Sequence, residues 1–143
     1  MQKYEILEHP ADLKIRVFGK DLPEVFVNAA LAMAEQQTRN SEIKKFYPER
    51  SRRVGNWETV EIESADLESL LVDWLSEILY RGEVNKKVYF DFAIKEFQKT
   101  KLRGKIKGVA VQQKSLDIKA ATYHDLSIKK TGQYWRATLI FDI

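Results

Sequence analysis

The clearest helix in this sequence lies at residues 66–79, which read DLESLLVDWLSEIL. Its apolar residues recur every three or four positions, as they do on one face of an amphipathic helix. Asp66 suits the N-cap, whereas Arg81 and Gly82 suit a cationic last turn and a stop. Trp74 stands within the leucine stripe, so we expect it to pack in the core.

A second helix is predicted upstream, over residues 22–33, where apolar residues again follow helical spacing. Asp21 is a natural N-cap, and Pro23 suits the first turn. Glu24 comes three residues after the cap, as in a capping box. Both helices are therefore expected to begin at an aspartate.

The remainder of the chain alternates between apolar and polar residues, which is typical of strands with one buried face. Val88, Phe90 and Phe92, for example, are expected to share a face opposite Tyr89. Strands and helices do not alternate regularly, which disfavours a doubly wound parallel sheet. We predict an α+β fold with a mostly antiparallel β-sheet structure of about eight strands and two amphipathic helices. Residues 39–56 are expected to form a mobile loop.

Composition narrows the class of protein. The chain has 143 residues, of which 44% are hydrophobic and 31% are charged, as expected for a single globular domain over residues 1–143. With 0 Cys and 2 His, it has no disulfide, thiolate zinc site or histidine-rich metal site. No apolar run approaches the ~20 residues of a membrane helix, and the N-terminus lacks a signal-peptide core. We therefore expect a cytoplasmic protein.

Charge is unevenly distributed along the chain. Residues 1–85 hold 11 Lys and Arg against 16 Asp and Glu, whereas residues 86–143 hold 13 against 5. Such asymmetry is found in proteins with a nucleic-acid or acidic partner, although the sequence alone favours a solvated basic sheet face.

The C-terminal residues suggest a binding site. An alternating strand runs from Trp135 to the last residue, and we expect Phe141 and Ile143 on its buried face. A fixed chain end would bring the Asp142 side chain next to the α-carboxylate of Ile143, and such neighbouring carboxylates need a cation. Asp12, at the start of another strand, could supply a third carboxylate for calcium or magnesium. Aspartates at strand ends are also common caps and turn formers, and the residues alone favour that interpretation over a metal site.

Four motifs in order across the chain together resemble the archease family. They are His9-Pro10-Ala11-Asp12, Asp66-Leu67-Glu68 with the helix that follows, Lys119-Ala120-Ala121-Thr122-Tyr123-His124, and Ile140-Phe141-Asp142-Ile143.

The resemblance implies a function and a site. Archeases are small α+β proteins that assist the RtcB-type tRNA-splicing ligase, so a non-catalytic activator is implied that promotes guanylylation and repeated turnover of that ligase. Family members bind a divalent ion, usually calcium, through residues that correspond to Asp12, Asp142 and Ile143. Contact with tRNA would be indirect. The resemblance leaves the roles of His9 and His124 open, and both suit turns at the surface.

Two other functions compete with this one. The first is a direct RNA-binding module, in which exposed cations on one strand follow the phosphates; these are Lys101, Arg103, Lys105 and Lys107. The second is a chaperone-like modulator of tRNA-modifying enzymes. A metal-dependent hydrolase is disfavoured, because no evident general base or nucleophile accompanies the carboxylates.

Overall fold

The computed structural model describes residues 2–38, 55–111 and 113–143. Most of the loop expected at residues 39–56 lies outside these ranges. The strands run, in chain order, β1 (Tyr4–Leu7), β2 (Leu13–Gly19), β3 (Glu58–Glu63), β4 (Lys87–Gln98), β5 (Lys101–Ala110), β6 (Ala120–Ala121), β7 (Ser127–Thr131) and β8 (Tyr134–Asp142). Helix α1 (Leu22–Thr38) follows β2, and α3 (Leu67–Asn85) follows β3. The prediction of about eight strands and two helices is confirmed for the described ranges.

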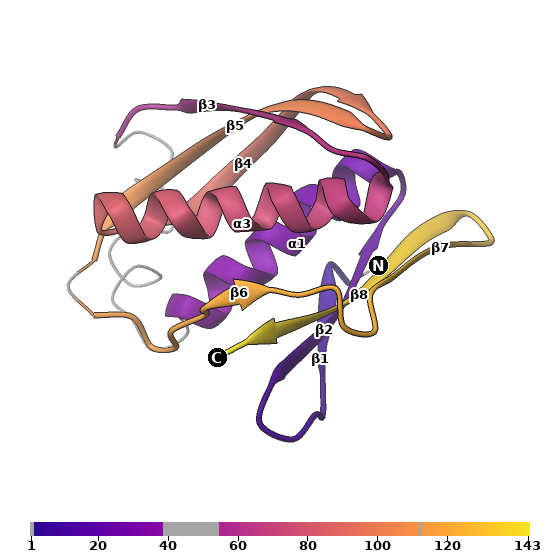
Figure 1. Cartoon of the computed structure of the whole chain (residues 1–143), viewed down its shortest axis with the longest axis horizontal. Helices are drawn as coiled ribbons and strands as arrows, with labels where there is room; N and C mark the ends of the chain where they lie inside the picture. Colours follow the sequence, from indigo (N-terminus) through magenta and orange to yellow (C-terminus); the bar gives the residue numbers. More distant parts are fainter. Residues whose placement is uncertain (1, 39–54, 112) are drawn as a thin grey trace.

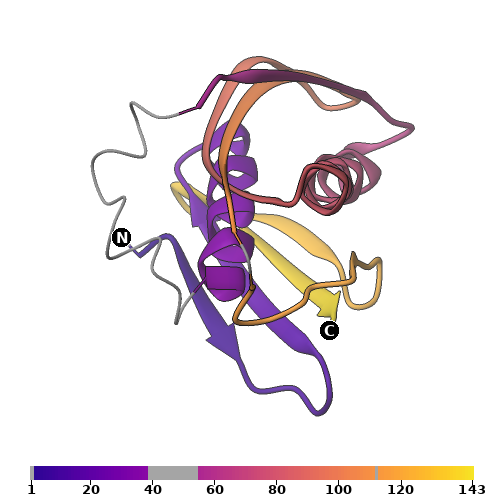
Figure 2. The ribbon, with the colours of Figure 1, turned by 90° about the vertical axis from the view of Figure 1, so that its left-hand side faces the viewer.

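The strands form two antiparallel sheets with both helices between them (Figure 1). The five-stranded sheet has the order β1-β2-β8-β6, and β7 also pairs with β8. The three-stranded sheet has the order β3-β5-β4. Figure 2 shows the same layers turned by 90°, with α3 seen end-on. Every strand pairing found is antiparallel, as predicted.

The core fills the space between the two sheets and is built largely from the helices. Trp74 is fully buried, and its indole Nε1 donates a hydrogen bond to the carbonyl of Phe26, 3.0 Å away. This bond joins the two helices and satisfies the buried indole donor. Gly104 of β5 lies beneath the Trp74 ring, where a Cβ would come within 3.1 Å of the ring. The expectation that Trp74 is a core residue is confirmed.

The predicted helix starts are also confirmed. The Asp66 carboxylate accepts a hydrogen bond from the Ser69 amide at 2.8 Å, which lowers the pKa of Asp66. Asp21 accepts from the Glu24 amide at 2.9 Å. The Glu24 carboxylate in turn accepts from the amide of Lys20, one residue before the cap. This arrangement is a slightly displaced capping box.

The predicted end of α3 is wrong. The helix does not stop at Gly82 but continues to Asn85, and Lys86 ends it in the left-handed conformation at φ 56°. Gly82 is instead a packing residue, because a Cβ there would lie 2.9 Å from the carbonyl oxygen of Lys87. The missing side chain lets the start of β4 lie directly against the helix.

The predicted alternation along β4 is also interrupted, first near the start of the strand. Tyr89 was expected opposite the apolar face, but it is 2% exposed and pairs with Gly108. The pairing with β5 shifts by one residue between Tyr89 and Asp91. Because of this shift, Tyr89 and Phe92 both face the core although they are three residues apart. A β-bulge changes the side that later residues face, and period-two reasoning cannot detect it.

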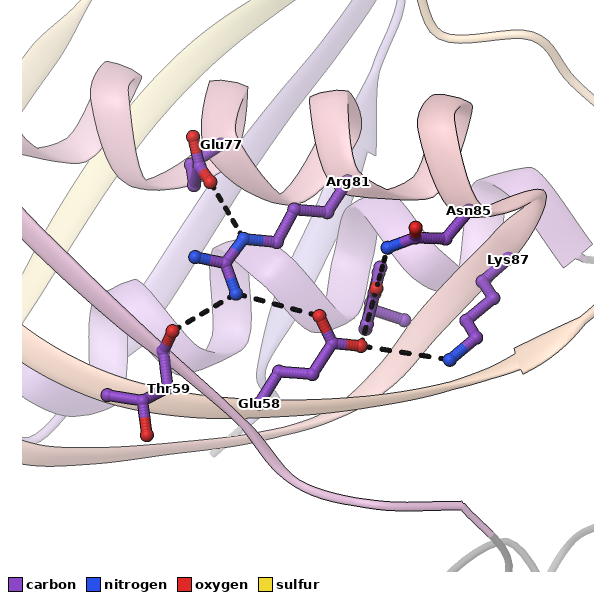
Figure 3. Close-up of polar contacts among 7 residues, drawn as sticks. Glu58, Thr59, Glu77, Arg81, Asn85 and Lys87 are labelled. Carbon is purple, nitrogen blue, oxygen red and sulfur yellow. Dashed lines mark hydrogen bonds and ion pairs between the residues drawn. The ribbon is translucent and has the colours of Figure 1, made fainter.

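A polar network fastens α3 to the three-stranded sheet (Figure 3). Arg81 donates to Glu77 at 2.7 Å and to the carbonyl of Thr59 at 3.0 Å, and it lies 3.6 Å from Glu58. Glu58 also accepts a 2.7 Å hydrogen bond from the Tyr89 hydroxyl. Burial and the bond to Glu58 raise the pKa of Tyr89 to about 12. Arg81 thus joins helix and strand instead of capping the helix end.

Gly82→Ala should destabilise the protein. Alanine in an ordinary helix interior is about 1 kcal/mol more favourable than glycine. Here the new Cβ meets the Lys87 carbonyl, so we expect the free energy of unfolding in urea to fall by about 1–3 kcal/mol. Ser76→Ala, in the same helix, is the control and should change it by less than about 0.5 kcal/mol. An increase in stability for Gly82→Ala would contradict the close approach.

Tyr89 should make stability depend on alkaline pH. The neutral phenol is favoured in the folded state, so its contribution is complete below the ordinary tyrosine pKa near 10 and is lost as the pH approaches about 12. Urea unfolding of Tyr89→Phe should show a weaker loss of stability between these pH values than the unmodified protein. Tyr80→Phe is the control, because Tyr80 is 64% exposed. Identical pH profiles for the unmodified protein and Tyr89→Phe would refute this role.

Candidate metal centre

The predicted site residues lie at one end of the five-stranded sheet, where β2 begins and β8 ends. The antiparallel register pairs Leu13 with Phe141. Asp12 directly precedes Leu13 and Asp142 directly follows Phe141, so the register sets the two aspartates opposite each other. Residues separated by 130 positions in sequence are thereby brought to one sheet end.

The end of β8 is held from both sides. Asp142 pairs with Ala120 of β6, and its carbonyl accepts a 2.8 Å hydrogen bond from the Lys119 amide. Thr122 donates to the Ile140 carbonyl through its amide at 3.1 Å and its hydroxyl at 2.8 Å. The expectation that this part of the chain is fixed is confirmed as far as Asp142.

The expected burial of Ile143 is wrong. Phe141 is fully buried, but Ile143 is 40% exposed. The strand ends at Asp142, so Ile143 lies beyond the ladder and beyond the core that covers Phe141. Ile143 directly follows Asp142, so its main-chain oxygens lie close to that residue at the end of the sheet.

Asp12 is carried by the turn between β1 and β2. Ala11 adopts a left-handed conformation at φ 64°, which turns the chain just before Asp12. His9 Nδ1 lies 3.4 Å from Asp12 Oδ2, and this buried nitrogen makes no hydrogen bond. Together with Ile6 and Leu13, these residues line a hollow of about 600 Å³. The sequence reasoning missed this pairing, although the i, i+3 spacing of His9 and Asp12 was its signal.

His124 stands apart from this arrangement. Its side chain is 69% exposed, and Nε2 lies 3.9 Å from the Asp125 carboxylate in the turn after β6. Asp125 has a left-handed φ of 52°. These observations confirm His124 as a surface residue of a turn.

The donor set suits a hard cation. Asp12 and Asp142 offer carboxylate oxygens and Ile143 offers main-chain oxygens, which are the ligands that calcium and magnesium prefer. Within residues 2–38, 55–111 and 113–143, no three His, Cys, Asp or Glu side chains are grouped as a metal cluster. A centre built here therefore needs main-chain oxygens as well as the two aspartates.

In β5, the basic strand considered for RNA binding, nearby acidic side chains offset much of the positive charge. Lys101 and Arg103 of β5 pair with Glu63 and Glu61 of β3, and Arg103 also donates to Glu96 of β4 at 2.9 Å. These acids offset the cations on the outer face of the three-stranded sheet.

Lys107 was expected to be exposed on the same face, and this expectation is wrong. The residue is only 2% exposed, and its Nζ lies 4.8 Å from the centre of the Trp57 ring. A cation–π contact of this kind holds the ammonium against the protein. Of the four cations of β5, only Lys105 pairs with no acid on either neighbouring strand, so β5 offers little free positive charge to phosphates.

Neither α1 nor α3, the helices of the described ranges, is both long and apolar enough to cross a membrane.

The fold and site define a class of small α+β protein with two antiparallel sheets, two enclosed helices and paired aspartates at a sheet end. The model of the archease protein family (MTH1598/TM1083) matches residues 4–143. The chain belongs to the archease family, as its four motifs suggested.

Individual relatives agree with this assignment. The chain is 39% identical to protein archease of Methanosarcina acetivorans, over 99% of this chain and 97% of the relative. It is 33% identical to protein archease of Sulfurisphaera tokodaii, over the whole of both chains. The solution structure of Methanobacterium thermoautotrophicum protein 1598 covers all of both chains with a TM-score of 0.72 and 29% identity.

A more distant structure supports the fold alone. It is the crystal structure of a Thermotoga maritima protein described as an archease and possible chaperone. The match has a TM-score of 0.63 and 17% identity, and it covers 96% of this chain and 94% of the other.

The opposed aspartates can be tested by cross-linking. The chain has no cysteine, so Asp12→Cys combined with Asp142→Cys introduces one possible intramolecular disulfide. Opposed positions in an antiparallel pair lie within the ~4.4–6.8 Å between Cα atoms that a disulfide spans. We expect mild oxidation to form this disulfide, measured by mass spectrometry after alkylation. Asp12→Cys with Asp91→Cys, on different sheets, is the control; equal cross-linking of both pairs would contradict the register.

Proposed function

We propose that this protein is a non-catalytic activator of an RtcB-type tRNA-splicing RNA ligase, acting in the cytoplasm. In this proposal, the carboxylates of Asp12 and Asp142 and the main-chain oxygens of Ile143 hold a divalent cation, calcium in the first instance. The protein promotes guanylylation of the ligase and repeated turnover.

The register between β2 and β8 is the observation that supports this proposal most. The ladder ends at the pair Leu13 and Phe141, so the backbone places the next residues, Asp12 and Asp142, opposite each other before any side-chain rotamer is considered. Opposed carboxylates repel each other, so an arrangement fixed by the backbone favours a shared cation. Membership of the archease family is the second support, because the same residues were reached from the family's motifs.

Exposure makes the site suitable for contact with a partner. Asp142 and Ile143 are exposed, and about a third of the Asp12 side chain is accessible. Asp12 and Asp142 would present a rigid anionic corner to the active site of the ligase. A bound divalent ion would supply concentrated positive charge there. Because GTP carries its own metal ions into guanylylation, we propose that this corner helps to position them.

The chaperone-like alternative rests on the description of the Thermotoga maritima protein as a possible chaperone. A modulator of tRNA-modifying enzymes would not need the paired aspartates. Variants of Asp12 and Asp142 therefore separate the ligase activator from the chaperone-like modulator.

Asp12→Asn and Asp142→Asn should each remove stimulation of ligase guanylylation while the protein stays folded. Each loses one anionic ligand of the proposed centre, so calcium affinity should fall at least about tenfold in titration calorimetry. Guanylylation is measured with radiolabelled GTP and a cognate ligase, with and without each variant.

Asp91→Asn is the matched control, because Asp91 lies on the three-stranded sheet and is paired with Lys107. It should stimulate the ligase and bind calcium like the unmodified protein. Full stimulation by both Asp12→Asn and Asp142→Asn would overturn the proposed mechanism. No stimulation by the unmodified protein would overturn the proposed function itself.

A further inference from the structure

The outer face of the five-stranded sheet has a charge pattern that the sequence did not reveal. Along β2, Leu13 and Ile15 are buried toward the helices. Because successive side chains alternate, Lys14 and Arg16 lie on the opposite face of the sheet. Both helices lie between the two sheets (Figure 2), so the opposite face of the five-stranded sheet is not covered by either helix.

Strand pairing adds two more cations to this face. Phe18 of β2 pairs with Arg136 of β8, and Arg136 pairs with Lys129 of β7. Directly opposed residues share a face, so residues from the two ends of the chain form one group. We call this group the outer basic face; its cations are Lys14, Arg16, Lys129 and Arg136.

Little negative charge offsets these cations. Glu5 of β1 pairs with Arg16 and accepts a 3.1 Å hydrogen bond from its Nη1. Otherwise the acidic residue of this face within the described strands is Asp142, at its far end. The outer face of the three-stranded sheet differs, because Lys101, Arg103 and Lys107 of β5 each pair with at least one acid on a neighbouring strand.

The guanidinium of Arg16 is only partly used. Its Nη1 is paired with Glu5, but its buried Nε has no hydrogen-bond partner. About a third of the Arg16 side chain remains accessible, so the guanidinium can still meet a ligand beside its bond to Glu5. An arginine fork is well suited to phosphate oxygens.

The neutral residues of the face favour a nucleic acid over a protein partner. Ser127 and Thr138 offer hydroxyls, and Tyr134 stands edge-on to Phe18 with ring centres 6.0 Å apart. The apolar residues Phe18 and Ile140 also alternate onto this face, but they are only 9% and 1% exposed. None of the strongly exposed large apolar residues of the described chain occupies an outward-facing strand position of this sheet; they are Ile6, Trp57, Tyr80, Val84, Tyr123 and Ile143. Nucleic-acid interfaces are more polar and more positive than protein interfaces, which usually have an apolar centre.

We infer that the outer basic face binds the phosphodiester backbone of a single-stranded nucleic acid, which is RNA in the setting of the proposed function. Lys14 and Arg16 are two residues apart on a strand, or about 6.8 Å, which is comparable to the separation of successive phosphates. Arg136 and Lys129 continue the row on the next two strands.

The candidate metal centre adjoins this face. Asp12 and Asp142 follow the same alternation as Lys14 and Ile140, so they lie at the end of the outer basic face. Their charge repels phosphates when unpaired and is neutralised by a divalent cation. Calcium should therefore strengthen RNA binding. This coupling rests on the proposed centre, whereas backbone binding by the four cations does not.

Fluorescence anisotropy with a labelled oligouridylate of about 20 nucleotides tests the inference. With three or four phosphates contacted, the logarithm of the affinity should fall with the logarithm of salt concentration with a slope of about −2 to −3. Lys14→Gln with Arg136→Gln should weaken binding at least about tenfold and reduce the slope by about 1.4. Lys14→Arg with Arg136→Lys keeps the charges and should bind within about twofold.

Lys101→Gln with Lys105→Gln is the matched control, because it removes the same charge from the other sheet and should leave binding within about twofold. Equal loss in this control, or no binding by the unmodified protein at low salt, would overturn the inference. So would equally tight binding of polyglutamate, which would indicate a partner protein. Binding of oligothymidylate with the same dependence on Lys14 and Arg136 would support backbone recognition without a need for the 2′-hydroxyl.

The ligase assay separates this inference from the proposed function. RNA binding without ligase stimulation by the unmodified protein would leave the inference standing and remove the proposed function. Stimulation of the ligase without RNA binding would support the proposed function and overturn the inference of RNA binding. Loss of the calcium effect on RNA binding in Asp12→Asn, with the salt slope retained, would support the coupling; an unchanged calcium effect would overturn it.

Discussion

The position of β8 inside the five-stranded sheet is the constraint on which the rest of the structure depends. This strand pairs with β2 on one side and with β6 and β7 on the other. Its inward side chains, including Leu139 and Phe141, complete the core beneath the helices. Its pairing with β2 also fixes which residues meet at the sheet end. Core formation and assembly of the candidate centre are therefore consequences of one set of backbone hydrogen bonds.

Both proposed surfaces follow from the same pairing. The register that opposes Asp12 and Asp142 also opposes Phe18 and Arg136, so the anionic corner and the outer basic face are fixed relative to each other. A shift of one residue would turn every side chain of β8 to the other side of the sheet. The buried residues of β8 prevent such a shift, since it would expose the core. Packing of the inner face of the sheet thus fixes which side chains lie together on its outer face.

Local patterns in the sequence predicted the helices and strands well, but they predicted poorly how these elements pack and pair with one another. The stripe around Trp74 and the cap at Asp66 identified α3, because helix formation depends on neighbours three and four residues apart. Gly82 was misread as a stop, since its packing against Lys87 becomes visible only when β4 is in place. Alternation indicated that Lys14 lies on a polar face, but only strand order brings it onto the same face as Arg136. The meeting of Asp12 with Asp142 was suggested by the fixed end of the chain and implied by the family motifs, whereas no local rule links residues 130 positions apart.

The outer strands of the two sheets also bear on self-association. Exposed strand edges can template the addition of another chain. β1 comprises four residues, and β3 carries Glu58, Glu61 and Glu63 at the border of its sheet. A second copy paired in antiparallel register on β3 would set Glu58 opposite Glu63, so like charges would meet at both ends of the added strand. The composition of this border therefore disfavours the addition of another chain at β3.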